Sequence, residues 1–268
     1  MSGSSNRDAR PAARTPSATD AQRLERPPAR PIPPSLELAW GLREEGTRGP
    51  RRGLTLERIV DAGIELAAIE GVGSLSMAKI AKRLGVGTMS LYRYVAAKDE
   101  LLTLMVDSAL GTPPPLPKRG GWRAGLTAWC DGVRGAYRRH PWALKVPISA
   151  PPLGPNNVAW LNRALESMAG TRLSEQDKLS SVLLLSGFVR NEATLTADFA
   201  AAFGEEQVMP GYGTLLLQIT SAAEFPALHR AIASGALDDE DDMDLEYRFG
   251  MARILDGIGE LIDGRLIP

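Results

Sequence analysis

Residues 88–93 place hydroxyl, apolar and guanidinium side chains directly after a Gly-Val-Gly turn. The segment is Thr-Met-Ser-Leu-Tyr-Arg. At helical spacing, Leu91 and Val95 point inward, and the exposed side chains are those of Thr88, Met89, Ser90, Tyr92 and Arg93. Groups of these types reach base edges and phosphates in a major groove. The pattern therefore predicts binding of double-stranded DNA.

Two short helices around this turn would position these side chains. Ser76 is a good N-cap for the first helix, and Leu75 and Ile80 have the spacing of a hydrophobic staple. The first helix would end at Gly85, where a left-handed C-terminal residue is favoured. The second helix must then begin near residues 87–88, after the tight turn that is typical of a helix-turn-helix motif.

A helix upstream of the motif completes a three-helix unit. Thr55 is the expected N-cap of an upstream helix, and the segment Gly71–Gly73 ends it. Its buried face would consist of Leu56, Ile59, Val60, Ile64 and Ala67. A further helix is expected over residues 98–110, directly after the motif. Three helices in about 45 residues form a plausible minimal core.

Residues 86–101, VGTMSLYRYVAAKDEL, resemble the signature of the TetR/AcrR regulators, which runs roughly Val-Ser-x-Gly-Thr-Leu-Tyr-x-His-Phe-x-x-Lys-Glu-Glu-Leu. The matching positions are Val86, Leu91, Tyr92, Lys98, Glu100 and Leu101. Gly87 replaces the usual Ser, Met89 replaces a small residue, and Tyr94 replaces His. The last two changes alter the expected base-reading surface, so the operator of a relative cannot be transferred to this chain. The resemblance is strongest over residues 54–110. It extends more weakly through the C-terminal half, which resembles the all-helical regulatory domain of the branch that contains the tetracycline repressor.

The resemblance implies a role for each matching position in binding a DNA operator. Base contacts are implied for Thr88, Met89, Ser90, Arg93 and Tyr94, phosphate contacts for Tyr92 and Lys98, and contacts with the DNA backbone for Ser76 and Met77. Two alternatives remain at this point. Met89 could contribute to packing instead, and Lys98 could be a solvated surface charge.

The first 52 residues form a Pro/Arg-rich extension that is predicted to be mostly disordered, because 8 of the 20 prolines lie in the first 50 residues and no periodicity persists. Within it, Ser35–Arg43 is expected to form a short docking helix with Ser35 as its cap and Trp40 on its surface. The basic stretch that contains Arg51 and Arg52 could lie along the DNA backbone or enter the minor groove; a solvated linker is the alternative.

Composition and charge set limits on the function. The net charge is −1, but residues 1–54 hold ten Arg against six acids, whereas Asp238–Asp244 packs six acids into seven residues. The single cysteine, Cys130, excludes an internal disulfide. We find no nucleophile elbow, P-loop or metal-ligand spacing, so we expect neither an enzyme nor a cofactor or metal. No signal peptide or membrane span is visible, and the expected location is the cytoplasm.

The rest of the chain is predicted to be helical, which makes the fold class all-α: a helix-turn-helix DNA-binding domain over residues 53–111, a Pro-rich linker over 112–121, and a larger helical-bundle regulatory and dimerisation domain over 122–268. Helices are expected over Trp122–Arg139, from Asn156 or Asn157 to Met168, from Ser174 to about Ala202, and over Asp244–Asp263, with two shorter helical segments after Pro210.

The resemblance further implies a homodimer that binds a palindromic operator and is released by a small-molecule inducer that remains unidentified. The implied dimer interface consists of Leu184, Gly187, Met251, Ile254, Leu255, Ile258 and Ile262, although packing within one chain could also explain the last five. The implied ligand-binding residues are Trp129, Val133, Tyr137, Trp160, Phe188 and Asn191. Repression is favoured on family grounds. The alternatives are activation, control by a protein partner, action without a ligand, and, least favoured, a helical-bundle enzyme fused to a DNA-binding domain.

Overall fold

The computed structural model describes residues 32–43, 53–148, 151–203, 211–237 and 244–264. Within these ranges all regular elements are helices, which confirms the all-α prediction. The chain divides into two units, residues 1–33 and 34–268, and every described helix belongs to the second unit. Among the described helices, none is both long enough and apolar enough to cross a membrane.

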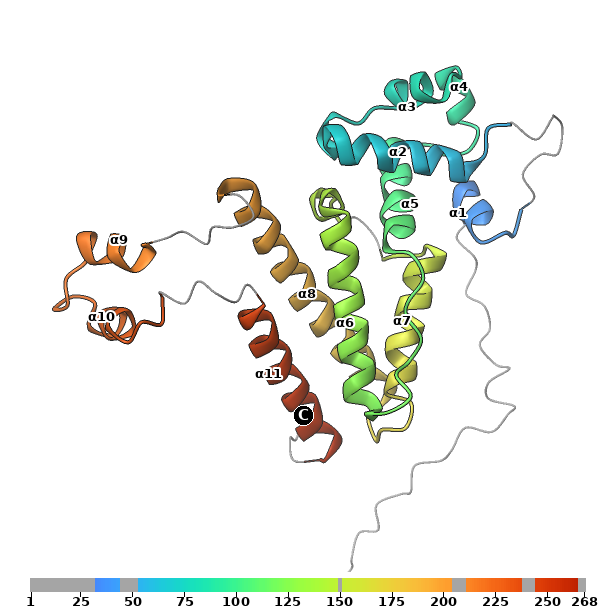
Figure 1. The fold of residues 1–268 in the computed structure, drawn as a ribbon. Coiled ribbons are helices and arrows are strands. Elements are labelled where there is room, and N and C mark those ends of the chain that lie inside the picture. The colour runs from blue at the N-terminus through green and yellow to red at the C-terminus, as the bar shows by residue number, and fades with distance from the viewer. Residues whose placement is uncertain (1–31, 44–52, 149–150, 204–210, 238–243, 265–268) are drawn as a thin grey trace, which may run out of the picture. The chain divides into compact units, whose positions relative to one another are not determined.

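Three helices form the helix-turn-helix unit, α2 (Leu56–Glu70), α3 (Met77–Leu84) and α4 (Thr88–Leu91), and α5 (Lys98–Leu110) follows it (Figure 1). The Thr55 side chain caps α2 by accepting a hydrogen bond from the Arg58 amide, at 3.2 Å. Ser76 caps α3 by accepting one from the Lys79 amide, at 3.3 Å. Gly85 ends α3 in the left-handed conformation, with φ 69°. The predicted caps and helix ends are thus confirmed.

Side chains from all four of these helices meet in one core. The fully buried members are Ile59 of α2, Ile80 of α3, Leu91 of α4, and Leu101 and Met105 of α5. Burying a side chain of this size contributes about 1.5–3 kcal/mol. The short helix α4 is therefore held by the insertion of Leu91 into this core, because four residues cannot form a stable helix alone.

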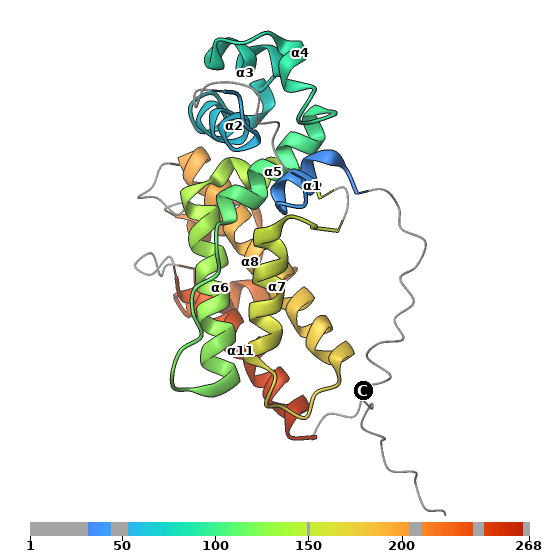
Figure 2. The ribbon, with the colours of Figure 1, turned by 90° about the vertical axis from the view of Figure 1, so that its right-hand side faces the viewer.

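A second group of helices packs side by side: α6 (Gly121–Arg139), α7 (Pro155–Ser167), α8 (Glu175–Phe203) and α11 (Leu245–Ile262). α6 contacts both α7 and α8, and α8 contacts α11 (Figures 1 and 2). Their shared core includes Leu126, Met168, Leu185 and Val189. The expected N-cap of α8 is confirmed, since Ser174 Oγ accepts a hydrogen bond from the Asp177 amide.

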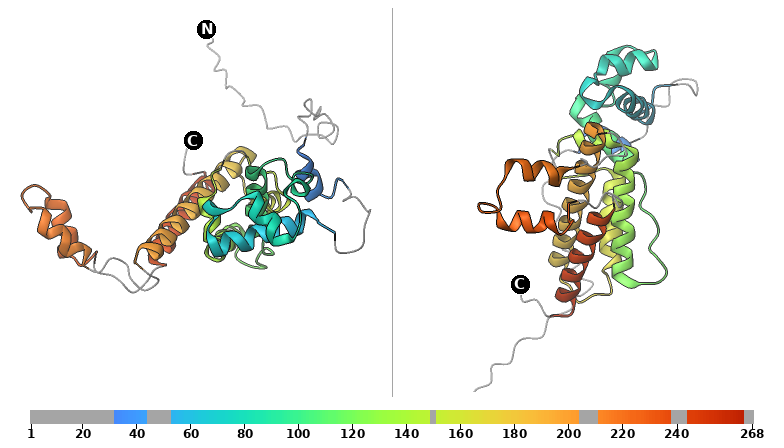
Figure 3. Two further views of the ribbon diagram at one scale, coloured as in Figure 1. Left: turned by 90° about the horizontal axis from the view of Figure 1, so that it is seen from above. Right: turned by 60° about the vertical axis from the view of Figure 1, so that its left-hand side comes forward.

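The remaining elements are short. They are α1 (Pro34–Ala39), the 3₁₀ turns Val72–Ser74 and Pro141–Lys145, and the helices α9 (Tyr212–Ile219) and α10 (Pro226–Ala233). Figure 3 shows α9 and α10 as a hairpin, in which the Thr220 hydroxyl lies 3.0 Å from Nε2 of His229.

The beginning of α7 differs from the sequence prediction. The N-cap is Gly154 and the first helical residue is Pro155, so neither Asn156 nor Asn157 is the cap. Instead, the backbone amides of both residues donate hydrogen bonds to the carboxylate of Asp107 on α5, at 3.2 and 2.8 Å. Proline suits the first helical position, and a carboxylate is favourable at a helix N-terminus. A residue on another helix thus caps α7.

Ser35 also has a different role from the predicted one. The helix α1 begins one residue earlier, at Pro34, and the Ser35 side chain is fully buried. Its hydroxyl group donates to Oε1 of Glu100 on α5 instead of capping α1. Leu36 and Leu38 of α1 pack against the core formed by α2–α5.

Candidate nucleic-acid interface and ligand pocket

The helix α4 presents a mixed apolar and polar surface to solvent. Met89 is 78% exposed and Tyr92, the residue after the helix, is 45% exposed. Arg93 is exposed as well, while Thr88 and Ser90 are half-buried. Because Leu91 fixes the opposite face in the core, these side chains occupy a defined surface on which a guanidinium, a phenol and hydroxyl groups lie together.

Tyr94 is placed differently from the other predicted base-reading residues. Its ring is half-buried against the core of α2–α5, and its hydroxyl group donates to the Leu54 carbonyl at 2.6 Å. This bond joins the end of the recognition segment to the residues that precede α2. In this conformation the hydroxyl group is committed within the chain, and Tyr94 braces the motif instead of facing outward.

The remaining predicted DNA-binding residues lie at helix starts or outside the described part of the chain. Met77 has a buried side chain, and the Ser76 hydroxyl is occupied as the cap of α3, so neither side chain points freely to solvent. Lys98 is the half-buried first residue of α5. Arg51 and Arg52 lie outside the described residues.

Two ion pairs hold α3 against α2. Lys79 Nζ lies 2.6 Å from the Glu70 carboxylate, and Arg83 forms hydrogen bonds to Glu65. The hydrogen bond from Lys79 lowers the pKa of Glu70. All four side chains are substantially exposed, so the pairs stabilise little individually. They do engage two of the cations that the sequence places on α3.

Three of the predicted ligand-binding residues are buried in the core of the bundle. Trp129, Val133 and Trp160 are each less than 8% exposed. Nε1 of Trp129 donates to the Trp160 carbonyl at 2.8 Å, and Nε1 of Trp160 donates to the Gly111 carbonyl at 2.7 Å. The two indole rings meet edge to face, 6.0 Å apart. Their polar atoms are thus satisfied within the chain, and these residues form core structure.

The other three predicted ligand-binding residues are scattered. The Tyr137 hydroxyl accepts a hydrogen bond from Arg190 at 3.3 Å, and Asn191 is exposed on α8. Phe188 stacks on Tyr247, with ring centroids 5.9 Å apart. None of the six predicted ligand-binding residues lines the cavity described next, although Phe188 contacts Tyr247, which does.

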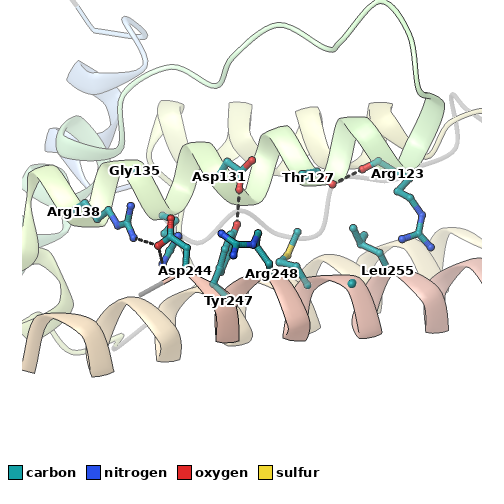
Figure 4. A pocket seen from close by; sticks show the side chains of 12 residues that line it. Arg123, Thr127, Asp131, Gly135, Arg138, Asp244, Tyr247, Arg248 and Leu255 are labelled. Atoms are coloured by element: carbon teal, nitrogen blue, oxygen red, sulfur yellow. Dashed lines mark hydrogen bonds and ion pairs between the residues drawn. The ribbon is translucent and has the colours of Figure 1, made fainter. Parts of the chain in front are cut away.

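A cavity of about 590 Å³ lies between α6 and α11 (Figure 4). Its apolar surface is formed by Met251, Ala252 and Leu255 of α11. Its polar surface is formed by Arg123, Thr127, Asp131, Arg134, Arg138, Asp244, Tyr247 and Arg248, with Gly135 between them. No local sequence pattern indicates this cavity, because its two walls are more than 100 residues apart in the chain.

Arg134 is the central charged group of this cavity, and its side chain is only 6% exposed. Nε and Nη2 bind both carboxylate oxygens of Glu192, at 2.8 and 2.6 Å. Nη2 also binds Oδ1 of Asp244 at 2.8 Å, and Arg138 binds the same oxygen at 2.6 Å. The hydrogen bond from Arg134 is the main cause that lowers the pKa of Asp244. Two guanidinium groups thus share one carboxylate at the start of α11.

Tyr247 completes the polar wall. Its ring lies 4.0 Å from the Arg134 guanidinium carbon, a distance at which cation–π attraction is strong. Its hydroxyl group donates to Oδ1 of Asp131 at 2.7 Å. Burial is the main cause that raises the pKa of Tyr247, and this hydrogen bond adds to it.

The predicted dimer residues separate into two groups. Met251, Leu255 and Ile258 are each 4% exposed in the core of their own chain, and the half-buried Ile254 and Ile262 pack against that core. The packing alternative therefore explains the α11 stripe, and its buried members cannot also form an external interface.

Leu184 and Gly187 remain on the surface of α8. Leu184 is 55% exposed, and a Cβ atom added at Gly187 would have nothing within 4 Å. Further exposed apolar side chains are Leu183 of α8, at 75%, and Phe249 of α11, at 60%. Sequence reasoning missed Phe249 because the apolar stripe pointed to the buried face of α11.

Comparisons with known proteins match both parts of the chain. Residues 59–105 match the family "Bacterial regulatory proteins, tetR family", and residues 114–262 match "Tetracyclin repressor-like, C-terminal domain". The HTH-type transcriptional repressor DrrR1 of Streptomyces coeruleorubidus is 36% identical over 247 residues, which cover 86% of this chain and 87% of that protein.

Solved structures of ActR, a TetR family protein of Streptomyces coelicolor, have the same fold. The complex of ActR with (S)-DNPA superposes with a TM-score of 0.64 at 28% identity, and the complex with actinorhodin with a TM-score of 0.65 at 28% identity. Each match covers 76% of this chain and 96% of ActR. With its helix-turn-helix unit, its helical bundle and these matches, the chain belongs to the TetR family of transcriptional regulators.

Proposed function

We propose that this protein is a ligand-responsive transcriptional repressor that binds a palindromic operator as a homodimer. The observation that carries the proposal is the surface of α4, where Met89, Tyr92 and Arg93 are exposed while Leu91 anchors the helix. These side chains can read base edges, and Lys98 at the start of α5 can bind a phosphate. The repressor DrrR1, which is similar over most of both chains, supports repression as the outcome.

A homodimer follows from the limited contact area of one motif. Two symmetry-related recognition helices about 34–36 Å apart would bind successive half-sites of an inverted repeat. The exposed apolar side chains of Leu183 and Leu184 on α8, with Phe249 on the adjacent α11, support a second copy of the chain as the partner for this face.

The ligand site that the geometry favours is the cavity between α6 and α11. Its apolar wall at Met251 and Leu255 suits a hydrophobic ring system, and its guanidinium groups suit a carboxylate or phenolate. An anionic ligand would compete with Asp244 for Arg134 and Arg138, and would thereby change the start of α11. The ActR structures with (S)-DNPA and actinorhodin support a small organic ligand of this kind.

The DNA-binding part of the proposal is tested by selecting duplexes from a random-sequence pool with the full-length protein. With the selected duplex, Arg93→Ala should change the base preference at one position of each half-site. Lys98→Ala should weaken binding to all sequences and reduce the slope of log affinity against log salt by about 1. Lys82→Ala, on the exposed surface of α3, is the matched control. Unchanged affinity and preference in both variants would refute the assignment.

The ligand-binding part is tested with actinorhodin and (S)-DNPA as probes. A probe that binds should raise the melting temperature and release the selected duplex. Ligand and DNA each lower the affinity of the protein for the other by the same factor, which corresponds to a coupling free energy of typically about 1–3 kcal/mol. Ala252→Phe, which fills the cavity, should abolish both effects and leave duplex binding intact. Release that persists in this variant would place the ligand elsewhere. Release by neither probe would favour control by a protein partner or by another compound.

A further inference from the structure

A short N-terminal segment joins the helix-turn-helix unit to the start of α7. This segment, here called the N-terminal strap, consists of α1 and Trp40, residues 34–40, and lies outside the residues that match the two families. Figure 2 shows α1 beside α5 and near the beginning of α7. One side chain at each end of the strap forms a hydrogen bond to a distant part of the chain.

The first end of the strap binds the junction between α4 and α5. The buried Ser35 hydroxyl donates to Oε1 of Glu100. The other carboxylate oxygen of Glu100 accepts a hydrogen bond from the backbone amide of Ala96, in the turn that follows α4. The N-cap of α5, Ala97, has no side chain to supply such a bond. Glu100 therefore fixes the turn between α4 and α5, and the hydrogen bond from Ser35 fixes the position of Glu100.

The second end of the strap binds the loop that leads into α7. Nε1 of Trp40 donates to the Leu153 carbonyl at 2.8 Å. Leu153 directly precedes Gly154, the N-cap of α7, and the first amides of α7 are held by Asp107 of α5. The strap and α5 thus each form their own hydrogen bonds at the start of α7.

The two ends differ in burial. Ser35 is 0% exposed and Trp40 is 43% exposed. When a buried hydrogen bond breaks, its groups are left unsatisfied, whereas the groups of an exposed hydrogen bond can bond to water, so the Trp40 end opens more readily than the Ser35 end. We propose that the strap moves with α5, closes reversibly on Leu153, and thereby positions the α4–α5 junction relative to α7. Ser35 and Trp40 are then positioning residues for operator binding, a consequence that rests on the proposed function.

Hydrogen exchange in the absence of DNA tests whether the strap links its two ends. Ser35→Ala removes the bond at α5, and Trp40→Phe removes the bond at Leu153 while keeping an aromatic ring. Each variant should accelerate exchange of amides at both ends, in segments 96–101 and 154–158, by about fivefold, the ratio that corresponds to one net hydrogen bond. Leu42→Ser, at a side chain that is 69% exposed just after the strap, should change neither.

Acceleration confined to the end nearest each substitution would overturn the proposal, because α1 would then be only a surface helix. If both ends respond, the affinity for a duplex selected by the wild-type protein decides the positioning role. Both variants should bind that duplex about fivefold more weakly, with the Leu42→Ser affinity unchanged. Wild-type affinity in both variants would overturn the positioning role. Failure of the wild type to select any duplex would instead reject the proposed function, while the exchange result would still decide whether the strap links its ends.

Discussion

Replacing Gly154 with alanine should destabilise the protein by breaking the contact between α5 and α7. The backbone at Gly154 has φ −67° and ψ 151°, which any residue adopts, so the substitution causes no backbone strain. A Cβ atom there would lie 2.2 Å from Cγ and Oδ1 of Asp107. The carboxylate must move away, and it would then lose the hydrogen bonds that it accepts from the backbone amides of Asn156 and Asn157.

The size of the effect follows from the two groups that lose hydrogen-bond partners, the N-terminus of α7 and the Asp107 carboxylate. Loss of a helix cap costs about 0.5–2 kcal/mol, and an unsatisfied buried polar group costs about 1–3 kcal/mol. Asp107 is only 4% exposed, so the carboxylate has little access to water. We expect the free energy of unfolding to fall by about 2–4 kcal/mol. For a chain of this size the melting temperature should fall by about 5–15 °C.

Urea denaturation followed by circular dichroism measures this loss. Gly170→Ala is the matched control, because nothing lies within 4 Å of a Cβ at that position; it should be neutral or stabilise by up to about 1 kcal/mol. In an Asp107→Ala background, Gly154→Ala should cost less by at least about 1 kcal/mol, the coupling expected for residues in contact. The reasoning is refuted if Gly154→Ala is as harmless as Gly170→Ala, or if its cost is the same in both backgrounds.

Three further outcomes are expected. Tyr94→Phe should lower the free energy of unfolding in urea by about 0.5–1.5 kcal/mol and weaken binding of the selected duplex; loss of base preference without loss of stability would return Tyr94 to the base-reading surface. Glu192→Ala removes the bidentate partner of the buried Arg134 but leaves its bond to Asp244, and should cost about 1–3 kcal/mol, whereas Arg138→Ala should cost less than about 1 kcal/mol; similar costs would contradict the difference in burial. The pKa of Asp244 is lowered below 3.8 by folding, so its contribution is present above pH 3.8 and is lost as pH falls further; acid titration of stability should therefore be shallower in Asp244→Asn, and equal slopes would contradict this.

The limits of sequence reasoning are clearest at α11. Its apolar stripe was correctly predicted to be helical, but the same stripe fits burial in one chain and burial between two chains. Burial of Met251, Leu255 and Ile258 in their own core decides between them. The predicted aromatic ligand site shows the same limit. Aromatic residues on helices fit a ligand site and a core equally well, but the indole N–H groups of Trp129 and Trp160 bind carbonyls of the same chain.

The helices and the helix-turn-helix motif were determined by the sequence itself, because caps, glycine helix ends and apolar periodicity act over about four residues. Thr55, Ser76 and Gly85 show this directly. Only the tertiary structure could decide what joins the helices. Tyr94 binds a carbonyl 40 residues away, Asp107 caps a helix about 49 residues further on, and Ser35 binds Glu100 across 65 residues. No local pattern encodes such pairs, since each forms only after packing has brought two separately specified segments together.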